Sequence, residues 1–265
     1  MALVKVRELL EAGVHFGSRT SQWNPKMTPY IYGKRSKIHI IDVRQTLRGL
    51  VRACKFIESV AARGEKVIFV GTKRPAQETV RSEARRAGQF FVAQRWLGGT
   101  LTNLRTIRER VARLEELEAL EASGEIQRFS KKMISTINRE RRKISRNFEG
   151  IREMTKMPGA VILVDPKEEH IALAEALKVG ISIVAVADTD CDPEPIDFVI
   201  PANDDAIRSV EVLVRVLADA CLAGTSRMSE MAMIAARGGD LSSAGPGLAA
   251  EIDASAGAVT FGGKD

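Results

Sequence analysis

The stretch Ala160-Val161-Ile162-Leu163-Val164-Asp165-Pro166 decides the fold class. Five consecutive apolar residues, rich in β-branched side chains, end in a turn dipeptide, which is typical of a strand that is buried on both faces. Residues 66–70 and 181–186 repeat this pattern and end near Gly71 and Asp188. Shorter strands are predicted at 38–41, 90–92 and 198–200. Fully apolar strands of this kind are characteristic of a parallel sheet.

Amphipathic helices separate most of these strands. Residues 46–62 place apolar side chains on one side at steps of three or four, and residues 168–179 and 204–223 do the same. Gly180 is suited to end the second of these helices. Strands that alternate with single helices form βαβ units. The sequence therefore predicts the α/β class, with a doubly wound, mostly parallel sheet that has helices on both faces.

One long segment has no strand pattern. Residues 101–157 are rich in Glu, Arg, Lys and Leu, and they carry two narrow apolar stripes, one on either side of Gly124. Steps of three, four and seven residues are coiled-coil spacing. We predict an antiparallel coiled-coil hairpin with arms of about 20 residues, each about 30 Å long. A helix pair that packs flat on the sheet is the alternative.

The chain is therefore expected to contain one α/β domain with an insertion. Residues 1–100 and 158–226 form the α/β domain, and residues 101–157 form the helical hairpin. Residues 227–265 are rich in Ser, Gly and Ala and have no sustained apolar period. Such a composition predicts a disordered tail.

Charge is distributed unevenly along the 265 residues. The net charge is +6, but residues 1–110 carry 22 basic and 8 acidic side chains, whereas residues 158–265 carry 7 and 18. A basic first half predicts a polyanionic partner. No apolar run reaches the roughly 20 residues that a membrane span needs, and the first residues lack the apolar core of a secretion signal. Cys54, Cys191 and Cys221 form no CxxC pair, which predicts buried free thiols in a reducing cytoplasm.

No catalytic or metal-binding constellation stands out. The sequence contains neither a GxSxG nor an HExxH motif, and His15, His39 and His170 lie far apart. Residues 188–193 place acids at alternate positions like a calcium loop, but Pro193 replaces the required glycine. A solvated turn is the expected structure, with a Mg²⁺ contact as the alternative. We predict no cofactor, no metal and no enzymatic activity.

The loop from Gly71 to Pro75 is a candidate ligand site, because ligands of doubly wound folds bind at the carboxyl ends of strands. Its Gly, Thr, Lys and Arg could cradle a phosphate at a helix N-terminus. The spacings GxxxxGK[ST] and GxGxxG are both absent. A contact to an RNA backbone is the preferred interpretation, and an enzyme or nucleotide-binding protein is the alternative.

Basic residues interleaved with aromatic residues form two clusters, one at 19–37 and one at 95–110. A third cluster of cations covers 131–146 and has no aromatic residue; a solvated coiled-coil face with Glu partners is the alternative to a polyanion contact there. Cations can contact phosphates while aromatic rings stack on exposed bases. We predict phosphate contacts from Lys26, Lys34, Arg35, Lys37, Lys73, Arg74, Arg95, Arg105 and Arg108. The residues predicted to stack on bases or to anchor the loops are Trp23, Tyr30 and Trp96.

Six separated motifs resemble the bacterial small-subunit ribosomal protein S-two (S2) family. They lie at 12–17, 23–31, 69–73, 95–103, 188–189 and 197–207, in the order that the family has. Three positions differ from its usual pattern: Ser18 stands where His is usual, Ser182 where Pro is frequent, and Asp190 where Asn is frequent. The resemblance covers residues 5–225 and leaves out the tail.

This resemblance implies a structural constituent of the small ribosomal subunit in the cytoplasm. It implies that both the α/β body and the hairpin contact small-subunit ribosomal RNA. The implied partners also include neighbouring ribosomal proteins, protein S-one among them, and no membrane. An adaptor that binds only proteins through the hairpin is a third class, which would keep its partners after ribonuclease treatment.

Overall fold

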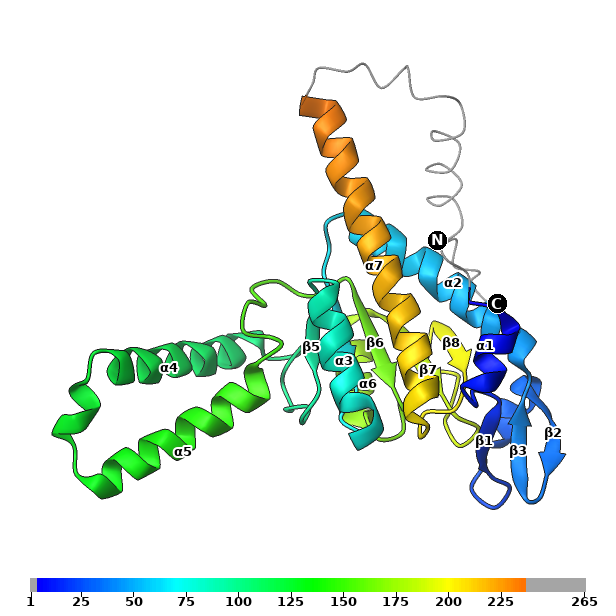
Figure 1. Cartoon of the computed structure of the whole chain (residues 1–265), viewed down its shortest axis with the longest axis horizontal. Helices are drawn as coiled ribbons and strands as arrows, with labels where there is room; N and C mark the ends of the chain where they lie inside the picture. The colour runs from blue at the N-terminus through cyan, green and yellow to red at the C-terminus, as the bar shows by residue number, and fades with distance from the viewer. Residues whose placement is uncertain (1–3, 237–265) are drawn as a thin grey trace, which may run out of the picture.

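A parallel sheet of five strands forms the centre of the protein. The computed structural model describes residues 4–236, and the strand order is β5-β4-β6-β7-β8 (Figure 1). The strands are β4 (Val67–Val70), β5 (Phe90–Val92), β6 (Ala160–Val164), β7 (Ser182–Ala187) and β8 (Phe198–Pro201). All four neighbouring pairs are parallel. The predicted doubly wound α/β class is confirmed.

Each face of this sheet has its own apolar core, because alternate residues of a strand point to opposite faces. Phe69 and Ile162 belong to one core, which is covered by α1 (Val6–Glu11), α2 (Val43–Ala62), α3 (Arg74–Arg86) and α7 (Ile207–Ala236). Ile68 and Leu163 belong to the other, which is covered by α6 (His170–Val179) and continues between α4 (Leu104–Ala122) and α5 (Lys131–Phe148). Burial on both faces explains why these strands are apolar throughout.

The ends of the helices agree with local sequence signals. The Asp42 side chain caps α2 by accepting the Arg44 backbone N–H at 3.0 Å. Gly180 ends α6 with a φ of +78°, a conformation that glycine adopts without strain. Gly49 of α2 approaches the Val199 carbonyl so closely that a side chain there would clash. Helix α2 therefore lies directly against β8.

A second, smaller sheet lies beside the first. Strands β1 (Phe16–Arg19), β2 (Ile31–Arg35) and β3 (Ile38–Ile41) pair antiparallel in the order β1-β3-β2. The 3₁₀ turn η1 (Pro25–Tyr30) connects the first two strands. The sequence predicted the strand at 38–41 but neither of its partners. Strand β2 lies at the edge of this sheet.

Helices α4 and α5 interrupt the βα alternation between β5 and β6. The 3₁₀ turn η2 (Glu125–Arg128) connects them, and they reach away from the sheet (Figure 1). Leu114, Leu117 and Ile144 are buried, whereas Phe129 and Met133, which continue the apolar stripe toward the turn, are 42% and 49% exposed. The stripe is therefore packed along most of both helices, as far as Leu117 and Ile137, and is exposed next to the turn. The coiled-coil geometry stays a prediction.

Helix α7 extends further than expected. It runs to Ala236, so the expectation of disorder from residue 227 is wrong for residues 227–236. Arg227 pairs with Glu58 of α2 at 3.2 Å, and Gly224 allows the two helices to cross closely. Strong helix formers such as Met and Ala follow these contacts. The remainder of the expected tail, residues 237–265, lies outside the described residues.

Two further expectations concern the cysteines and membrane-spanning helices. Cys54, Cys191 and Cys221 are buried and unbonded to one another, as predicted. Among the helices of residues 4–236, none combines the length with the hydropathy that crossing a membrane requires.

Candidate nucleic-acid interface

The Gly71–Pro75 loop and the loop that carries Arg95 lie at one edge of the five-stranded sheet. Arg74 follows β4 and Arg95 follows β5, and the carboxyl ends of parallel strands lie at the same edge. The small sheet is joined to this edge because the backbone N–H of Ser18 donates to Asp188 Oδ1 at 3.1 Å. A Cβ on Gly17 would lie 2.8 Å from Thr189, so only glycine permits this approach. We call this side of the molecule the carboxyl edge.

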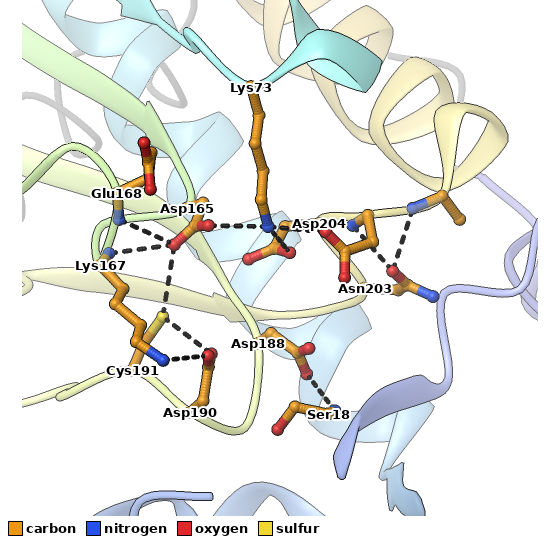
Figure 2. A network of polar contacts seen from close by, with 12 residues as sticks. Ser18, Lys73, Asp165, Lys167, Glu168, Asp188, Asp190, Cys191, Asn203 and Asp204 are labelled. Atoms are coloured by element: carbon orange, nitrogen blue, oxygen red, sulfur yellow. Dashed lines mark hydrogen bonds and ion pairs between the residues drawn. The ribbon is translucent and has the colours of Figure 1, made fainter. Parts of the chain in front are cut away.

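Lys73 lies inside a group of acids at the carboxyl edge. Its Nζ atom is 2.7 Å from Asp165 Oδ2, 2.8 Å from Asp204 Oδ1 and 2.7 Å from Asp205 Oδ1. Figure 2 shows the lysine reaching from the start of α3 to Asp165 and Asp204. The ammonium group is therefore occupied by carboxylates, and the predicted phosphate contact of Lys73 is not supported. The sequence could not show that β6 and β8 bring acids to this lysine.

The acid group shifts the proton affinities of its members. Burial lowers the pKa of the Lys73 ammonium, but hydrogen bonds to Asp165, Asp204 and Asp205 outweigh it and raise the pKa overall. Burial, followed by the negative charge of Asp165, raises the pKa of Asp204 to about 8. The Oδ2 atom of Asp204 is buried and has no hydrogen-bond partner within the described residues. A protonated Asp204 at neutral pH agrees with this environment.

Asp165, Cys191 and Asp204 are the set of described side chains that resembles a metal site most closely. One ligand atom from each lies within 4.8 Å of the others. Lys73 already provides a positive charge to two of them. Burial and then the negative charge of Asp165 raise the pKa of the Cys191 thiol, so this sulfur is held in its protonated form. The pairing of Asp165 and Asp204 with Lys73 therefore explains why these side chains lie together.

The turn after β7 is more buried than expected. Asp188 is 5% exposed and its Oδ1 atom accepts the Thr189 backbone N–H at 2.6 Å, so the expected solvated turn is wrong at this residue. Burial raises the pKa of Asp188 to about 6, against the opposing effect of the Thr189 amide. Ser18, which replaces the family's usual His, bonds through its Oγ atom to Thr189 Oγ1 at 2.6 Å. Ser18 thus helps to attach β1 to this turn.

Lys26 is also paired with acids from a distant part of the chain. Its Nζ atom is 2.8 Å from Asp192 Oδ2 and 2.6 Å from Glu194 Oε2. Similarly, Lys167 lies 2.7 Å from Asp190. The predicted phosphate contact of Lys26 therefore competes with two carboxylates. Together with Lys73, these lysines pair with six carboxylates and so offset part of the negative charge at the carboxyl edge.

Glu175 of α6 holds the loop that contains Arg95. Its carboxylate accepts hydrogen bonds from the Trp96 indole N–H at 3.1 Å and from the backbone N–H groups of Gly99, Leu101 and Thr102 at 2.7–3.1 Å. Burial raises the pKa of Glu175, but the amides of Thr102, Gly99 and Leu101 outweigh it, and the pKa is lowered overall. Sequence analysis missed Glu175 because its partners are backbone groups.

The predicted aromatic residues are mostly covered. Trp96 is only 6% exposed, so it anchors its loop and has no free face for a base. Trp23 is half-buried, with its ring centroid 4.9 Å from that of His39. Tyr30 is half-buried at the end of η1. In contrast, Tyr32, which was not among the predicted stacking residues, is 73% exposed.

Most of the predicted phosphate contacts are exposed. Arg105 pairs with Glu109 at 3.2 Å on the surface of α4. The exposed cations that have no ion pair among the described residues are Lys34, Arg35, Lys37, Arg74, Arg95 and Arg108.

The third basic cluster, on α5, divides in the same way. Arg141 pairs with Glu121 of α4, and Glu140 pairs with Arg113 at 3.5 Å, so these charges hold the two helices together. Lys131, Lys132 and Arg139 are exposed and have no ion pair among residues 4–236. Both interpretations of this cluster, a solvated helix face and a polyanion contact, are compatible with these positions.

The fold and this edge define a doubly wound α/β protein in which acids at the edge pair with lysines of the same chain and exposed cations remain unpaired among the described residues. The sequence of residues 9–224 matches the model of the family described as Ribosomal protein S2. The chain belongs to the ribosomal protein S2 family. The resemblance found in the six motifs is thereby confirmed.

The chain is similar to curated relatives over most of its length. It is 58% identical to "Small ribosomal subunit protein uS2" of Rhodopirellula baltica over 224 residues, which are 84% of this chain and 86% of the relative. It is 52% identical to a protein of the same name from Chloroflexus aurantiacus over 225 residues, which are 85% of this chain and 94% of the relative. Membership of this family makes the chain a structural ribosomal protein and not an enzyme, and the nucleotide-binding alternative at Gly71–Pro75 is not supported.

Proposed function

We propose that this chain is a structural constituent of the small ribosomal subunit that binds small-subunit ribosomal RNA through its carboxyl edge. The observation that carries this proposal is the separation of charges at the edge. Lys26, Lys73 and Lys167 pair with acids from the loops after β6, β7 and β8. Lys34, Arg74 and Arg95 are exposed and have no ion pair within residues 4–236, so their charge is available to a phosphate backbone.

The basic loop after β5 is held in place for such a contact. Glu175 fixes the backbone on both sides of Leu101, and Asn103 caps α4 by accepting the Thr106 backbone N–H at 3.5 Å. Arg95 lies just before this segment and Arg108 on the second turn of α4. Because the backbone between them is fixed, little conformational freedom is lost when RNA binds.

The salt dependence of RNA binding tests this proposal. Each phosphate that a cation neutralises contributes about 0.7–0.9 to the slope of log affinity against log salt concentration. Replacing Arg95 and Arg108 with Ala should lower both the affinity and this slope. The same change at Lys178, an exposed cation at the far end of α6, is the matched control and should leave both unchanged. An unaltered slope in the double variant would remove Arg95 and Arg108 from the interface.

Sedimentation of the tagged chain through a sucrose gradient tests its assembly. Migration with particles of small-subunit size is expected in lysates of the native cell. Loss of that migration in the variant that lacks Arg95 and Arg108, with the Lys178→Ala variant unaffected, would connect assembly with the carboxyl edge. Migration of the native chain only as free protein would contradict the ribosomal role.

We further propose that protein S-one is a neighbouring partner and that the hairpin is a separate arm of the protein. The first rests on the family resemblance and predicts that capture of protein S-one by this chain weakens after ribonuclease treatment without being abolished. The second regards residues 101–157 as an arm inserted into the α/β domain of residues 1–100 and 158–226. It is supported by the ion pairs that join α4 to α5 and by the direction of both helices away from the sheet.

A further inference from the structure

Tyr32 presents its ring to solvent in a strongly basic environment. Its exposure of 73% is the highest of any large apolar side chain among the described residues. A tyrosine ring in water exposes apolar surface without compensation, so a ring that remains this exposed is available to a ligand. The aromatic residues that the sequence singled out, Trp23, Tyr30 and Trp96, are all at least partly covered.

A β-bulge explains why Tyr32 is exposed. Ile31 pairs with Ile41 and Gly33 pairs with Ile40, so Tyr32 is the extra residue that has no partner on β3. A bulge at a sheet edge redirects a side chain, and β2 is an edge strand. A Cβ on the neighbouring Gly33 would meet no atom within 4 Å. The strand next to Tyr32 is therefore uncovered at Gly33.

Three cations accompany Tyr32 on the same hairpin. Lys34 and Arg35 end β2, and Lys37 belongs to the two-residue turn before β3; all three are exposed and have no ion pair among the described residues. Ser36 and Lys37 have φ values of +50° and +65°, as a tight hairpin turn of the primed type requires. The Lys37 carbonyl accepts the Thr20 backbone N–H at 3.0 Å, which joins the turn to the end of β1. The three charges are thus held on a fixed turn.

We propose that the β2–β3 hairpin binds an unpaired nucleotide of ribosomal RNA, with the base stacked on Tyr32 and the adjoining phosphates on Lys34, Arg35 and Lys37. Stacking on an aromatic ring combined with cations along the backbone is the general mode by which proteins bind single-stranded RNA. An acidic peptide would satisfy the cations but would leave the flat face of Tyr32 without a matching partner. This inference rests on the proposed function and specifies the element that carries it.

Substitutions at Tyr32 test the stacking. Full-length chain should bind transcribed small-subunit ribosomal RNA roughly 5- to 150-fold more weakly after Tyr32→Ala, the range that loss of one stacked base gives. Tyr32→Phe keeps the ring and should bind within about twofold of the native chain. Because no charge is removed, Tyr32→Ala should leave the salt slope unchanged, whereas Lys34→Ala, Arg35→Ala and Lys37→Ala should each lower it by about 0.7–0.9. Ultraviolet cross-linking should attach a nucleotide to the peptide that contains Tyr32.

Two controls separate the possible failures. Leu177→Ala removes a comparably exposed side chain, 50% exposed on α6, and should not alter binding. Equal binding by the native chain and Tyr32→Ala, while the three cation variants weaken binding, would overturn the stacking and leave the proposed function intact. The stacking would also be overturned if the native chain bound an acidic peptide and Tyr32→Ala weakened that binding as much as it weakened RNA binding. Absence of RNA binding by the native chain would refute the proposed function itself.

Discussion

The Nζ atom of Lys73 lies 2.8 Å from Oδ1 of Asp204, although the two residues are 131 positions apart in the chain. Lys73 follows β4 and Asp204 follows β8, and Asp165, which follows β6, completes the contact. One ammonium group therefore joins the carboxyl ends of three strands. A buried charge that loses its partner is much more costly than an exposed one, so this contact is expected to matter for stability.

Lys73 and its neighbour Arg74 should respond to substitution in opposite ways. Lys73→Met leaves buried acids without their cation and should lower the free energy of unfolding by about 3–5 kcal/mol. Arg74→Ala removes an exposed, unpaired cation and should change it by less than about 0.5 kcal/mol, while lowering the salt slope of RNA binding. Urea unfolding followed by circular dichroism measures the first effect. Equal stability of the two variants would contradict the structural role of Lys73.

Glu175 should be required for the shape of the loop after β5. In Glu175→Gln one acceptor oxygen is replaced by a donor, so buried N–H groups lose their partner and the free energy of unfolding should fall by about 3 kcal/mol. Trp96 should also become accessible to a fluorescence quencher. Glu168→Gln, at an exposed position just before α6, is the matched control and should behave like the native chain. A native-like quenching profile in Glu175→Gln would contradict the anchoring of Trp96.

The raised pKa of Asp188 should make the free energy of unfolding fall as the pH rises. Its pKa is raised from the ordinary 3.8 to about 6, chiefly by burial, so the folded state holds a proton that the unfolded chain has already lost. Its contribution to stability is present below pH 4 and is lost as the pH rises through 6. Asp188→Asn mimics the protonated form. It should match the native chain near pH 4 and exceed it at pH 8 by at most about 3 kcal/mol.

The comparison with Asp192 provides the control for this pH dependence. A hydrogen bond from Lys26 lowers the pKa of Asp192, so its charged form is favoured in the folded state. Asp192→Asn should therefore reduce stability at pH 8, the reverse of Asp188→Asn. Urea midpoints measured from pH 4 to pH 8 distinguish the two. A gain in stability for both variants at high pH would show that total charge, and not burial, controls the effect.

Lys37→Gly should raise the free energy of unfolding but weaken RNA binding. It has a φ of +65°, which costs a residue with a side chain about 1–2 kcal/mol. Lys37→Gly relieves this strain but adds backbone freedom to the unfolded chain, so a net gain of about 0.5–1 kcal/mol is expected. The same substitution should lower the salt slope of RNA binding by about 0.7–0.9. A slope equal to that of the native chain would show that Lys37 does not contact a phosphate.

The parallel sheet could be predicted from sequence because each of its strands is apolar on both faces. Residues 160–164 and 67–70 are buried throughout, and short, β-branched apolar runs bounded by turn residues are typical of strands covered on both faces. Strand β2 could not be predicted, because it combines one large aliphatic residue with Gly33 and two cations and lies at an edge. The length of α7 was underestimated for a related reason: its last turns have no apolar period, and the contact of Arg227 with α2 is invisible in the sequence.

The candidate site could be predicted only in part. Local composition identified the exposed cations Lys34, Arg35 and Lys37, because charge on a surface loop needs no partner. It could not show the ion pairs of Lys73, whose carboxylates come from other strands, and it overlooked Glu175, whose partners are amides of a distant loop. Interactions over long separations in the chain decide whether a charge is available, and composition does not contain them.

The open edge of the small sheet has a consequence for the chain before assembly. Unpaired backbone groups on an edge strand invite a second copy to add a strand, which is a common start of aggregation. The bulge at Tyr32 breaks the regular spacing that such an addition needs, and Lys34 and Arg35 would face the same charges on an incoming copy. The bulge and the two charges therefore disfavour the addition of a second copy at β2 before ribosomal RNA is bound.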